Sequence, residues 1–370
     1  MKNRELSSLK VAIVHDWLVG GGAELVVYEL HKMFPDAPVY TSYCTDEWRA
    51  KFDGKVKTGW LQHFGKVRKY IPFLRIWWFT HLKFDGYDLV ISSSGAEAKG
   101  IKVPTETLHI NYCHAPTHYY WSRYQEYMEH PGFGAFDPLA RLGLKLLVGP
   151  LRKWDYKAAQ RPNYMIANST HIQQEIKKYY GRDSTVIFPP VDISRFESSN
   201  SKDQSSRSGF LAGGRLTPYK RVDLAVQACT KLDLPLTVYG DGPDRKRLET
   251  IAGPSVKFAG FVSNDEVVRL LQTSAAYIFA LLDDFGIASI EALASGTPVI
   301  AYGAGGALNY IEPGKTGEFF EPQTVEALAN TLKNFDPKKY KESEIKESAK
   351  KFSTENFQKQ MTEFLEKTLD

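Results

Sequence analysis

Residues 283–306 read DDFGIASIEALASGTPVIAYGAGG, and this stretch decides the fold class of the C-terminal half of the chain. An apolar run, AAYIFAL at 275–281, leads into it, and a second run, TPVIAYG, lies inside it at 297–303. Both runs have the composition of buried strands, and ASIEALASG between them predicts a helix that stops at Gly296, before Pro298. A strand, a helix and another strand in succession predict a parallel sheet with helices on its faces.

Strand–helix alternation extends over most of the chain. Strands are expected at 9–15, 87–94, 107–113 and 163–169 in the first half, and at 209–214, 234–240, 256–261, 275–281 and 297–303 in the second. These runs carry almost no polar alternation, which is typical of strands covered on both faces. The two series therefore predict an α/β protein with two doubly wound, Rossmann-like domains.

A polar linker is predicted to separate the two domains. Residues 197–209, ESSNSKDQSSRSG, are rich in serine and charge and interrupt the strand–helix rhythm. We predict an N-terminal domain at 1–195, a linker at 196–208 and a C-terminal domain at 209–352, and we expect a helix at about 353–370 to pack back on the first domain. Because open α/β sheets bind ligands at the carboxyl ends of their strands, a cleft between facing domains is the expected ligand site.

Composition excludes several classes of protein. The 370 residues are 43% hydrophobic, which supports real cores, and a net charge of +4 is too small to argue for nucleic acid. Cys44, Cys113 and Cys229 are scattered and odd in number, as in reduced cytosolic proteins, and predict neither a disulfide framework nor a zinc site. The polar N-terminus predicts no signal peptide, and the lack of a run of about 18 apolar residues predicts no membrane span, so a cytoplasmic protein is expected.

Two glycine turns follow predicted strands. The triplet at 20–22 precedes a helix, and Gly213 and Gly214 end the first strand of the second domain. Glycines let a ligand approach the backbone closely, and N–H groups at a helix start favour an anion. Arg215 and Lys220 flank the second turn, and two cations at such a turn suit a diphosphate. In the alternative, the glycines at 20–22 form a tight turn without a ligand, and Arg215 and Lys220 are solvated surface charges.

Two carboxylates of the opening stretch, Asp283 and Glu291, are eight residues apart. Asp283 follows a strand and Glu291 is expected one turn into the helix, so both can face the same cleft. Carboxylates accept hydrogen bonds from the vicinal hydroxyls of a ribose or a hexose, and the N–H groups of Gly286 and Ile287 suit an anion. Together these features predict a nucleotide sugar as ligand. In the alternative, Asp283 and Asp284 cap the helix and Glu291 is a surface residue.

Several of these segments resemble one known family. DDFGIASIEALASGTPVIA resembles the E-x₇-E signature of the retaining glycosyltransferases of family 4, which have the two-domain GT-B fold. GGGAELVVYEL resembles the N-terminal glycine loop of that family, YCHAP at 112–116 its catalytic-site histidine segment, and IANST with FPPVD its interdomain region. GGRLTPYKRVDLAV resembles the diphosphate-binding Arg/Lys motif, particularly in the mannosyltransferase branch. The resemblance covers nearly the whole chain.

The resemblance implies roles for individual residues. Glu291 would bind the ribose hydroxyls of the donor, and Arg215 and Lys220 would neutralise the leaving diphosphate. Asp283 takes the place of the first glutamate and is one methylene shorter, which implies an altered hexose contact or one shifted to Asp284. The other implied donor contacts are Gly214 at the diphosphate turn, the backbone of Phe285, Gly286 and Ile287 at the hexose and phosphate, Gly21 and Gly22 at the phosphates from the opposite domain, His114 at the transferred sugar, and Gly260, Phe261 and Val262 near the base.

The function implied is transfer of a hexose with retention of configuration, most of all mannose from GDP-mannose, to a lipid-linked, polysaccharide or glycolipid acceptor. No essential metal or other cofactor is expected, and a turn before a helix explains Asp241 and Asp244 better than a metal site. The alternatives are UDP-glucose or another nucleotide hexose as donor, a nucleotide-sugar-binding protein without turnover, suggested by Asp283, and a nucleotide-sugar epimerase.

A basic, aromatic stretch marks the acceptor side of the predicted first domain. Residues 54–84 contain seven basic, eight aromatic and no acidic residues. Such interleaving suits an interfacial element on an anionic membrane surface, and residues 136–154 add a second apolar, basic stretch. In the alternative, the aromatic residues fill the core of the domain and line an acceptor pocket. Nucleic acid is not an expected partner, because no nucleic-acid motif accompanies the stretch.

Overall fold

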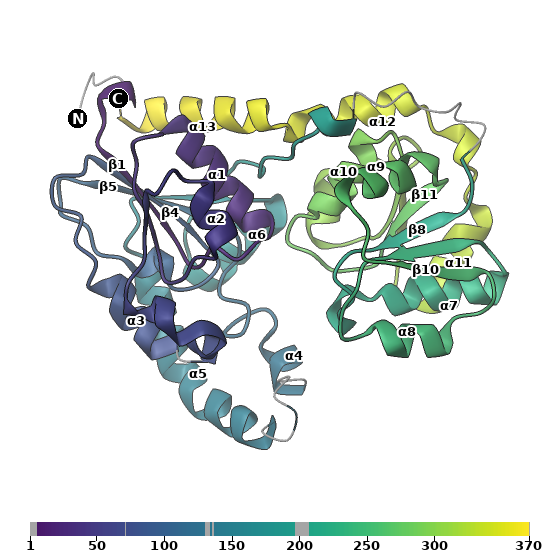
Figure 1. Cartoon of the computed structure of the whole chain (residues 1–370), viewed down its shortest axis with the longest axis horizontal. Helices are drawn as coiled ribbons and strands as arrows, with labels where there is room; N and C mark the ends of the chain where they lie inside the picture. Colours follow the sequence, from purple (N-terminus) through teal and green to yellow (C-terminus); the bar gives the residue numbers. More distant parts are fainter. Residues whose placement is uncertain (1–5, 71, 130–133, 135–136, 197–206, 370) are drawn as a thin grey trace. The chain divides into compact units, whose positions relative to one another are not determined.

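The chain forms two compact units in the computed structural model (Figure 1). The structure describes residues 6–70, 72–129, 134, 137–196 and 207–369, apart from the side chains of Ser7 and of residues 66–70. Unit 1 comprises Met1–Pro190 with Phe357–Asp370, and unit 2 comprises Val191–Asn356. The predicted linker at 196–208 falls mostly on residues outside the described ones.

Unit 1 contains a seven-stranded parallel sheet in the order β3-β2-β1-β4-β5-β6-β7. Its strands are β1 (Val11–His15), β2 (Val39–Thr41), β3 (Val56–Lys57), β4 (Leu89–Ser94), β5 (Leu108–Cys113), β6 (Tyr164–Ala167) and β7 (Thr185–Val186). Its helices are α1 (Gly22–Met33), α2 (Asp46–Ala50), α3 (Pro72–Thr80), α4 (Tyr124–Glu129), α5 (Asp137–Ala159), α6 (Thr170–Tyr180) and most of α13 (Thr354–Leu369). The 3₁₀ segments among the described residues of this unit include η1 (Leu6–Ser8), η2 (Trp60–Tyr70) and η3 (Ala98–Gly100).

Alternate residues of the central strand β1 contribute to two different core clusters of unit 1. Ile13 packs in a cluster with residues of α1, and Phe357, Met361 and Leu365 of α13 belong to the same cluster. Val14 packs on the other side of the sheet with a cluster that includes residues of α3. This is the period of two expected for a strand that is covered on both faces. The last helix therefore contributes to the core of the first unit.

Unit 2 contains a six-stranded parallel sheet in the order β10-β9-β8-β11-β12-β13. Its strands are β8 (Phe210–Gly213), β9 (Leu236–Tyr239), β10 (Val256–Gly260), β11 (Ala276–Phe279), β12 (Val299–Tyr302) and β13 (Gly317–Phe320). Its helices are α7 (Val222–Leu232), α8 (Arg245–Ile251), α9 (Asn264–Thr273), α10 (Ile287–Ala294), α11 (Val325–Asn334) and α12 (Glu342–Ala349). Its 3₁₀ segments are η5 (Ser194–Phe196), η7 (Pro218–Lys220), η8 (Gly305–Asn309), η9 (Pro337–Lys339) and η10 (Lys350–Phe352).

The strand, helix and strand predicted in succession at 275–303 are confirmed. Strand β11 leads through α10 into β12, and the two strands pair in parallel, with Tyr277 opposite Val299. Helix α10 ends at Ala294, and Gly296 follows with φ of 72°, the left-handed conformation that glycine adopts without strain. Two doubly wound, Rossmann-like units are thus present, as expected. Within the described part of the chain, no helix is long and apolar enough to cross a bilayer.

Candidate active site

Three strand ends of unit 2 are joined by close backbone contacts. The N–H of Gly214 donates to the carbonyl of Tyr239 at 3.0 Å, and the N–H of Gly240 donates to the carbonyl of Gly260 at 2.6 Å. A side chain on Gly240 would collide with the carbonyl of Gly214. The glycines therefore bring the carboxyl ends of β8, β9 and β10 together, at the edge where parallel sheets bind ligands.

Lys220 lies at the turn that follows β8. Its ammonium is next to Gly214, since a Cβ atom on that glycine would be 3.1 Å from Nζ. Burial lowers the pKa of Lys220, the Asp283 carboxylate raises it and the Arg215 guanidinium lowers it. The structure therefore brings together the two cations and the first carboxylate that the sequence indicated. Arg215 is exposed and Asp283 is half-buried.

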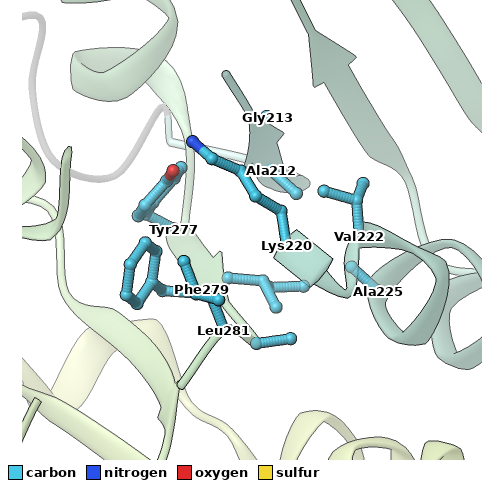
Figure 2. Close-up of a pocket in the computed structure, with 10 residues that line it drawn as sticks. Ala212, Gly213, Lys220, Val222, Ala225, Tyr277, Phe279 and Leu281 are labelled. Carbon is cyan, nitrogen blue, oxygen red and sulfur yellow. The ribbon is translucent and has the colours of Figure 1, made fainter. Parts of the chain in front are cut away.

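Figure 2 shows a small pocket that Lys220 helps to line. The side chain of Lys220 extends over a small pocket, and its amino group points toward the hydroxyl of Tyr277. Phe279, Leu281, Val222 and apolar atoms of β8 line the rest of the pocket. The pocket volume of about 10 Å³ leaves room for roughly one water molecule. Lys220 is thus held by apolar packing of its stem, with the charged end at the rim.

Glycines also fix the loop that precedes α10. The N–H of Gly306 donates to the carbonyl of Asp283 at 2.8 Å, and a Cβ atom on Gly306 would collide with the backbone of Phe285. The ring of Phe285 is buried, 5.5 Å from that of Phe352. Gly286 precedes the helix with φ of 103°. The glycine cluster at the end of the opening stretch therefore fixes the loop that carries Asp283, Asp284 and the start of α10.

The start of α10 has the chemistry of an anion site. The first N–H groups of a helix have no partner within the helix, and the helix dipole favours negative charge there. Ile287 is the first helical residue and is half-buried. With Lys220 and Arg215 on the neighbouring turn, this edge of unit 2 can hold a phosphate or diphosphate.

Glu291 is not the surface residue of the alternative interpretation. Its side chain is 20% exposed and forms an ion pair with Arg195 of η5. Burial raises the pKa of Glu291, and the Arg195 guanidinium lowers it. Tyr239 lies near the same carboxylate. Burial, and to a smaller extent the negative charge of Glu291, raise the pKa of the Tyr239 hydroxyl to about 12. Arg195 was not predicted as a site residue, although it lies three residues after the end of the FPPVD segment.

His114 follows β5 in unit 1 and is held on both sides. Its Nε2 is 2.7 Å from Oγ of Ser93, and its carbonyl accepts a hydrogen bond from Nδ2 of Asn168 at 2.9 Å. The ring of His15 lies edge-on to it, with ring centroids 6.1 Å apart. Nδ1 of His15 donates to the carbonyl of Ser93 at 2.6 Å. The imidazole of His114 is therefore oriented before any ligand arrives.

Asp16 organises the loop beside His114. Its carboxylate accepts hydrogen bonds from the backbone N–H groups of Gly95 and Ala96, both at 2.9 Å, and of Ala98 at 2.7 Å. The hydroxyl of Ser94 donates to it at 3.1 Å. Sequence reasoning missed Asp16 and Ser93, although polar residues at the ends of buried strands were a usable signal.

The N-terminal glycine turn already has an anionic partner. The carboxylate of Glu24 accepts hydrogen bonds from the N–H groups of Val19 and Gly20, at 3.2 and 3.1 Å. Gly21 is exposed, and Gly22 is the first residue of α1. A phosphate at this turn would therefore meet the N–H groups after Gly20 and would have the Glu24 carboxylate nearby.

The residues expected near the base lie on the edge strand. Gly260 ends β10, which is separated from β8 by β9. Phe261 is 88% exposed and Val262 is half-buried. The structure therefore brings Lys220, Arg215 and Asp283 together, whereas Phe261 lies two strands away from β8. His114, Gly21 and Gly22 belong to the other unit.

The basic, aromatic stretch at 54–84 divides between core and surface. Trp78, Phe79 and Phe84 are buried in the second core cluster of unit 1. Arg75 was counted among the surface cations, but this is wrong: it is buried and pairs with Glu97, Nη2 to Oε1 at 2.6 Å. Cations at 66, 68 and 69 have side chains outside the described ones. Among the described residues, no group of three or more His, Cys, Asp or Glu could hold a metal ion.

Two family models match the two halves of the chain. Residues 20–195 match the model described as "Glycosyltransferase Family 4", and residues 195–352 match "Glycosyl transferases group 1". Among solved structures, the fold is similar to that of Anabaena HepE in complex with UDP and glucose, with a TM-score of 0.66, 18% identity, and 96% of this chain and 99% of that chain covered. This likeness identifies the fold of both units as that of GT-B proteins.

Curated relatives match over part of their length. A GDP-mannose-dependent alpha-mannosyltransferase of Mycobacterium tuberculosis is 34% identical over 157 residues, 38% of this chain and 41% of that protein. A glycogen synthase of the same species is 26% identical over 185 residues, 46% of this chain and 44% of that protein. The chain thus spans less than half the length of these relatives. Because the two family models together match residues 20–352, the chain belongs to the GT-B glycosyltransferases of the group 1 and Family 4 type.

Proposed function

We propose that the protein is a nucleotide-sugar-dependent glycosyltransferase that moves mannose from GDP-mannose to a lipid-linked, polysaccharide or glycolipid acceptor. The observation that carries the proposal is the cluster of Lys220, Arg215 and Asp283 at the strand edge that also holds the start of α10. Two cations and helix N–H groups match the charge of a nucleoside diphosphate, which is the leaving group of such a reaction.

In the proposed reaction the bond between the anomeric carbon and the diphosphate oxygen breaks, and a bond to an acceptor hydroxyl oxygen forms. Negative charge grows on the diphosphate in the transition state. Lys220, Arg215 and the start of α10 would stabilise that charge, and groups that are positioned beforehand do so without the cost of reorganisation. The acceptor oxygen attacks the anomeric carbon on the face from which the diphosphate departs, and the acceptor proton passes to the departing diphosphate. The transferred sugar therefore retains its configuration.

Contacts to the donor sugar and ribose complete the proposal. Glu291 would accept hydrogen bonds from the ribose hydroxyls, and Asp283, Asp284 and the backbone from Phe285 to Ile287 would bind the hexose. His114, oriented by Ser93, would contact the transferred sugar from unit 1. The base would lie near Phe261 and Val262, and Gly21 and Gly22 would approach the phosphates.

The choice of mannose rests on relatives. Two mycobacterial relatives and one corynebacterial relative have names that specify GDP-mannose-dependent mannosyltransferases. UDP-glucose is the second candidate donor, because another relative is named 2-deoxystreptamine glucosyltransferase and one solved neighbour holds UDP-glucose. GDP-mannose is preferred because three of the relatives name it.

A thermal-shift screen of GDP-mannose, UDP-glucose, GDP and UDP tests the donor. A ligand present at 100 times its dissociation constant adds about 2.7 kcal/mol to stability. We expect GDP-mannose to give the largest shift and transfer of radiolabelled mannose to follow with an acceptor lipid extract. A larger shift with UDP-glucose would replace mannose by glucose, and no shift with any nucleotide sugar would overturn the proposal.

A further inference from the structure

We propose that unit 1 docks on an anionic phospholipid bilayer through the exposed apolar face of α5 and an exposed aromatic cluster formed by η2 and α3. The inference goes beyond the proposed transfer reaction and does not depend on the donor, because its elements belong to the first unit and its test requires no turnover.

The N-terminal half of α5 carries an apolar surface that the rest of unit 1 does not cover. No residue from 137 to 150 is buried, and burial begins at Leu151, which is 3% exposed. Leu139, Leu142 and Leu146 are 66%, 53% and 67% exposed. Figure 1 shows these turns of α5 extending beyond the sheet of the unit. Three such leucines at i, i+3 and i+7 form one stripe, and apolar patches of this kind mark interaction sites.

The apolar stripe is accompanied by positive charge. Helix α5 has five basic and two acidic residues. One of the acids, Asp155, is fully buried in an ion pair with Lys99, Nζ to Oδ1 at 2.7 Å, so it does not offset the surface charge. Lys145, Lys153 and Lys157 are exposed along the helix. A helix with apolar and cationic surface is the type that lies in the interface of an anionic membrane.

A cluster of exposed aromatic side chains lies on neighbouring elements. Trp60, Phe64, Phe73 and Trp77 are 37%, 42%, 45% and 51% exposed. The ring centroid of Trp60 is 5.4 Å from that of Phe64 and 6.1 Å from that of Trp77. Helices α3 and α5 both pack on η3, and Gly100 of η3 lies against Trp154 and Ala158 in the second half of α5, so the two surfaces belong to elements joined through η3. Tryptophan at the level of lipid headgroups is favoured, because its ring is amphipathic.

Charge favours a bilayer over a second copy of the chain as the occupant. The segment at 54–84 contains no acidic residue, and the cations of α5 outnumber its acids. A self-complementary interface would bring these cations against their own copies, and like charges oppose such contact. Anionic lipid headgroups instead supply the opposite charge, and acyl chains accept the leucines.

Co-sedimentation of the full chain with vesicles tests the proposal. We expect binding to vesicles of phosphatidylglycerol and phosphatidylcholine, and not to phosphatidylcholine alone. Binding should weaken with salt, because the Debye length falls from about 10 Å at 0.1 M to about 3 Å at 1 M. The double variants Leu142→Ser with Leu146→Ser, and Lys145→Glu with Lys153→Glu, should each bind roughly tenfold more weakly or worse. Leu308→Ser, which alters a leucine of unit 2 that is 56% exposed, should bind like wild type.

A site-specific label gives an independent measurement. Cys44, Cys113 and Cys229 are buried, so a dye on Leu146→Cys can be attached selectively. An environment-sensitive dye there should shift to the blue with phosphatidylglycerol vesicles, and the same dye on Leu308→Cys should not. The proposal is overturned by absent vesicle binding, by unchanged binding of both double variants, or by leucine variants that alter oligomeric state in place of lipid binding. None of these outcomes alters donor binding, which tests the proposed function separately.

Discussion

Arg195 and Glu291 form an ion pair within unit 2, although 96 residues separate them in the chain. Arg195 lies in η5, near the start of the unit, and Glu291 lies one turn into α10. Burial raises the pKa of the Glu291 carboxyl, and the guanidinium acts in the opposite direction. Arg195 therefore helps to keep a partly buried carboxylate ionised at the place where we propose that the donor ribose binds.

The first prediction concerns Arg195→Ala. Without the guanidinium, the pKa of Glu291 should rise further above its ordinary value. An acid with a raised pKa loses its ionised form as pH falls through that pKa, and the protonated form is the poorer acceptor for ribose hydroxyls. The dissociation constant of the donor, measured by calorimetry across pH, should therefore begin to rise at a higher pH in Arg195→Ala than in wild type.

Titration of the tyrosines near Glu291 does not interfere with this measurement. Tyr239 and Tyr277 face it, and burial raises the pKa of both hydroxyls, so they remain neutral in the acidic range. Glu291→Gln serves as the control, with weak binding that does not change with acid pH. Because a ribose contact is made equally in the ground and transition states, Glu291→Gln should affect binding more than kcat. Identical pH profiles for Arg195→Ala and wild type would contradict the role given to the pair.

The second prediction concerns the two cations at the end of β8. Lys220→Ala and Arg215→Ala should each reduce turnover by roughly 10²-fold or more, the scale of losing one preorganised contact to developing charge. Lys231→Ala is the matched control, because that lysine lies on the adjacent helix α7 in a surface pair with Glu326 at 3.8 Å. Near wild-type rates for both site variants would remove the diphosphate assignment.

The third prediction follows from the environment of Lys220. Burial and Arg215 lower its pKa, and Asp283 offsets part of the shift. A lysine with a lowered pKa loses its charge at a lower pH than usual, so turnover should decline on the alkaline side before about pH 10.4, the ordinary value. The pH dependence of kcat/KM measures this limb. Lys220→Arg, which stays charged, should move the decline to higher pH even if its maximal rate is lower.

The sequence was sufficient for the sheet strands that are long and apolar. Strands β1, β4, β5 and β11 lie inside longer, largely apolar runs of sequence, and all their residues except Leu108 are buried. Strands β2, β3, β7 and β13 were not predicted, because they do not lie inside a long apolar run of sequence. Their position is fixed by the neighbouring strand, for example Val39 opposite Ile13, which is tertiary information.

The candidate site was predictable only where its residues belong to one local segment. Lys220 and Asp283 each follow a strand, and parallel topology brings such ends together. Arg195 and Ser93 were missed, because the partner of each lies elsewhere in the chain and is selected by the fold. Burial was equally hard to predict: Arg75 is in the core, whereas Leu142 and Leu146 are exposed. The type of a residue, apolar or charged, does not by itself predict which side of its helix is covered.

The fourth prediction concerns stability of unit 1. Lys99 is fully buried, and its ammonium donates to Thr117 Oγ1 at 2.9 Å as well as pairing with Asp155. Removing one partner of a buried pair leaves the other charge uncompensated, so Lys99→Met should cost about 3–5 kcal/mol of unfolding free energy. Denaturant unfolding measures it. Lys177→Met, which breaks an exposed pair with Asp183, should leave the unfolding free energy nearly unchanged.

The last prediction compares two serine–histidine pairs whose serines are adjacent on β4. Ser93 Oγ is 2.7 Å from Nε2 of the half-buried His114, and Ser92 Oγ is 2.8 Å from Nε2 of the fully buried His109. Burial lowers the pKa of His109 to about 3, so this imidazole is neutral and belongs to the interior. The two pairs have the same chemistry but different surroundings, which makes each the control for the other.

Ser93→Ala should reduce kcat by roughly tenfold or more with little loss of stability. His114 can replace the lost hydrogen bond with water, but its ring is then no longer held in place, and small misplacements at a reacting centre are costly. Ser92→Ala should leave kcat unchanged and cost about 1–3 kcal/mol, because the buried imidazole of His109 loses its partner. Single-turnover rates and thermal unfolding of both variants measure the contrast. If Ser92→Ala slows turnover as much as Ser93→Ala, the effect is structural, and His114 has no distinct role at the transferred sugar.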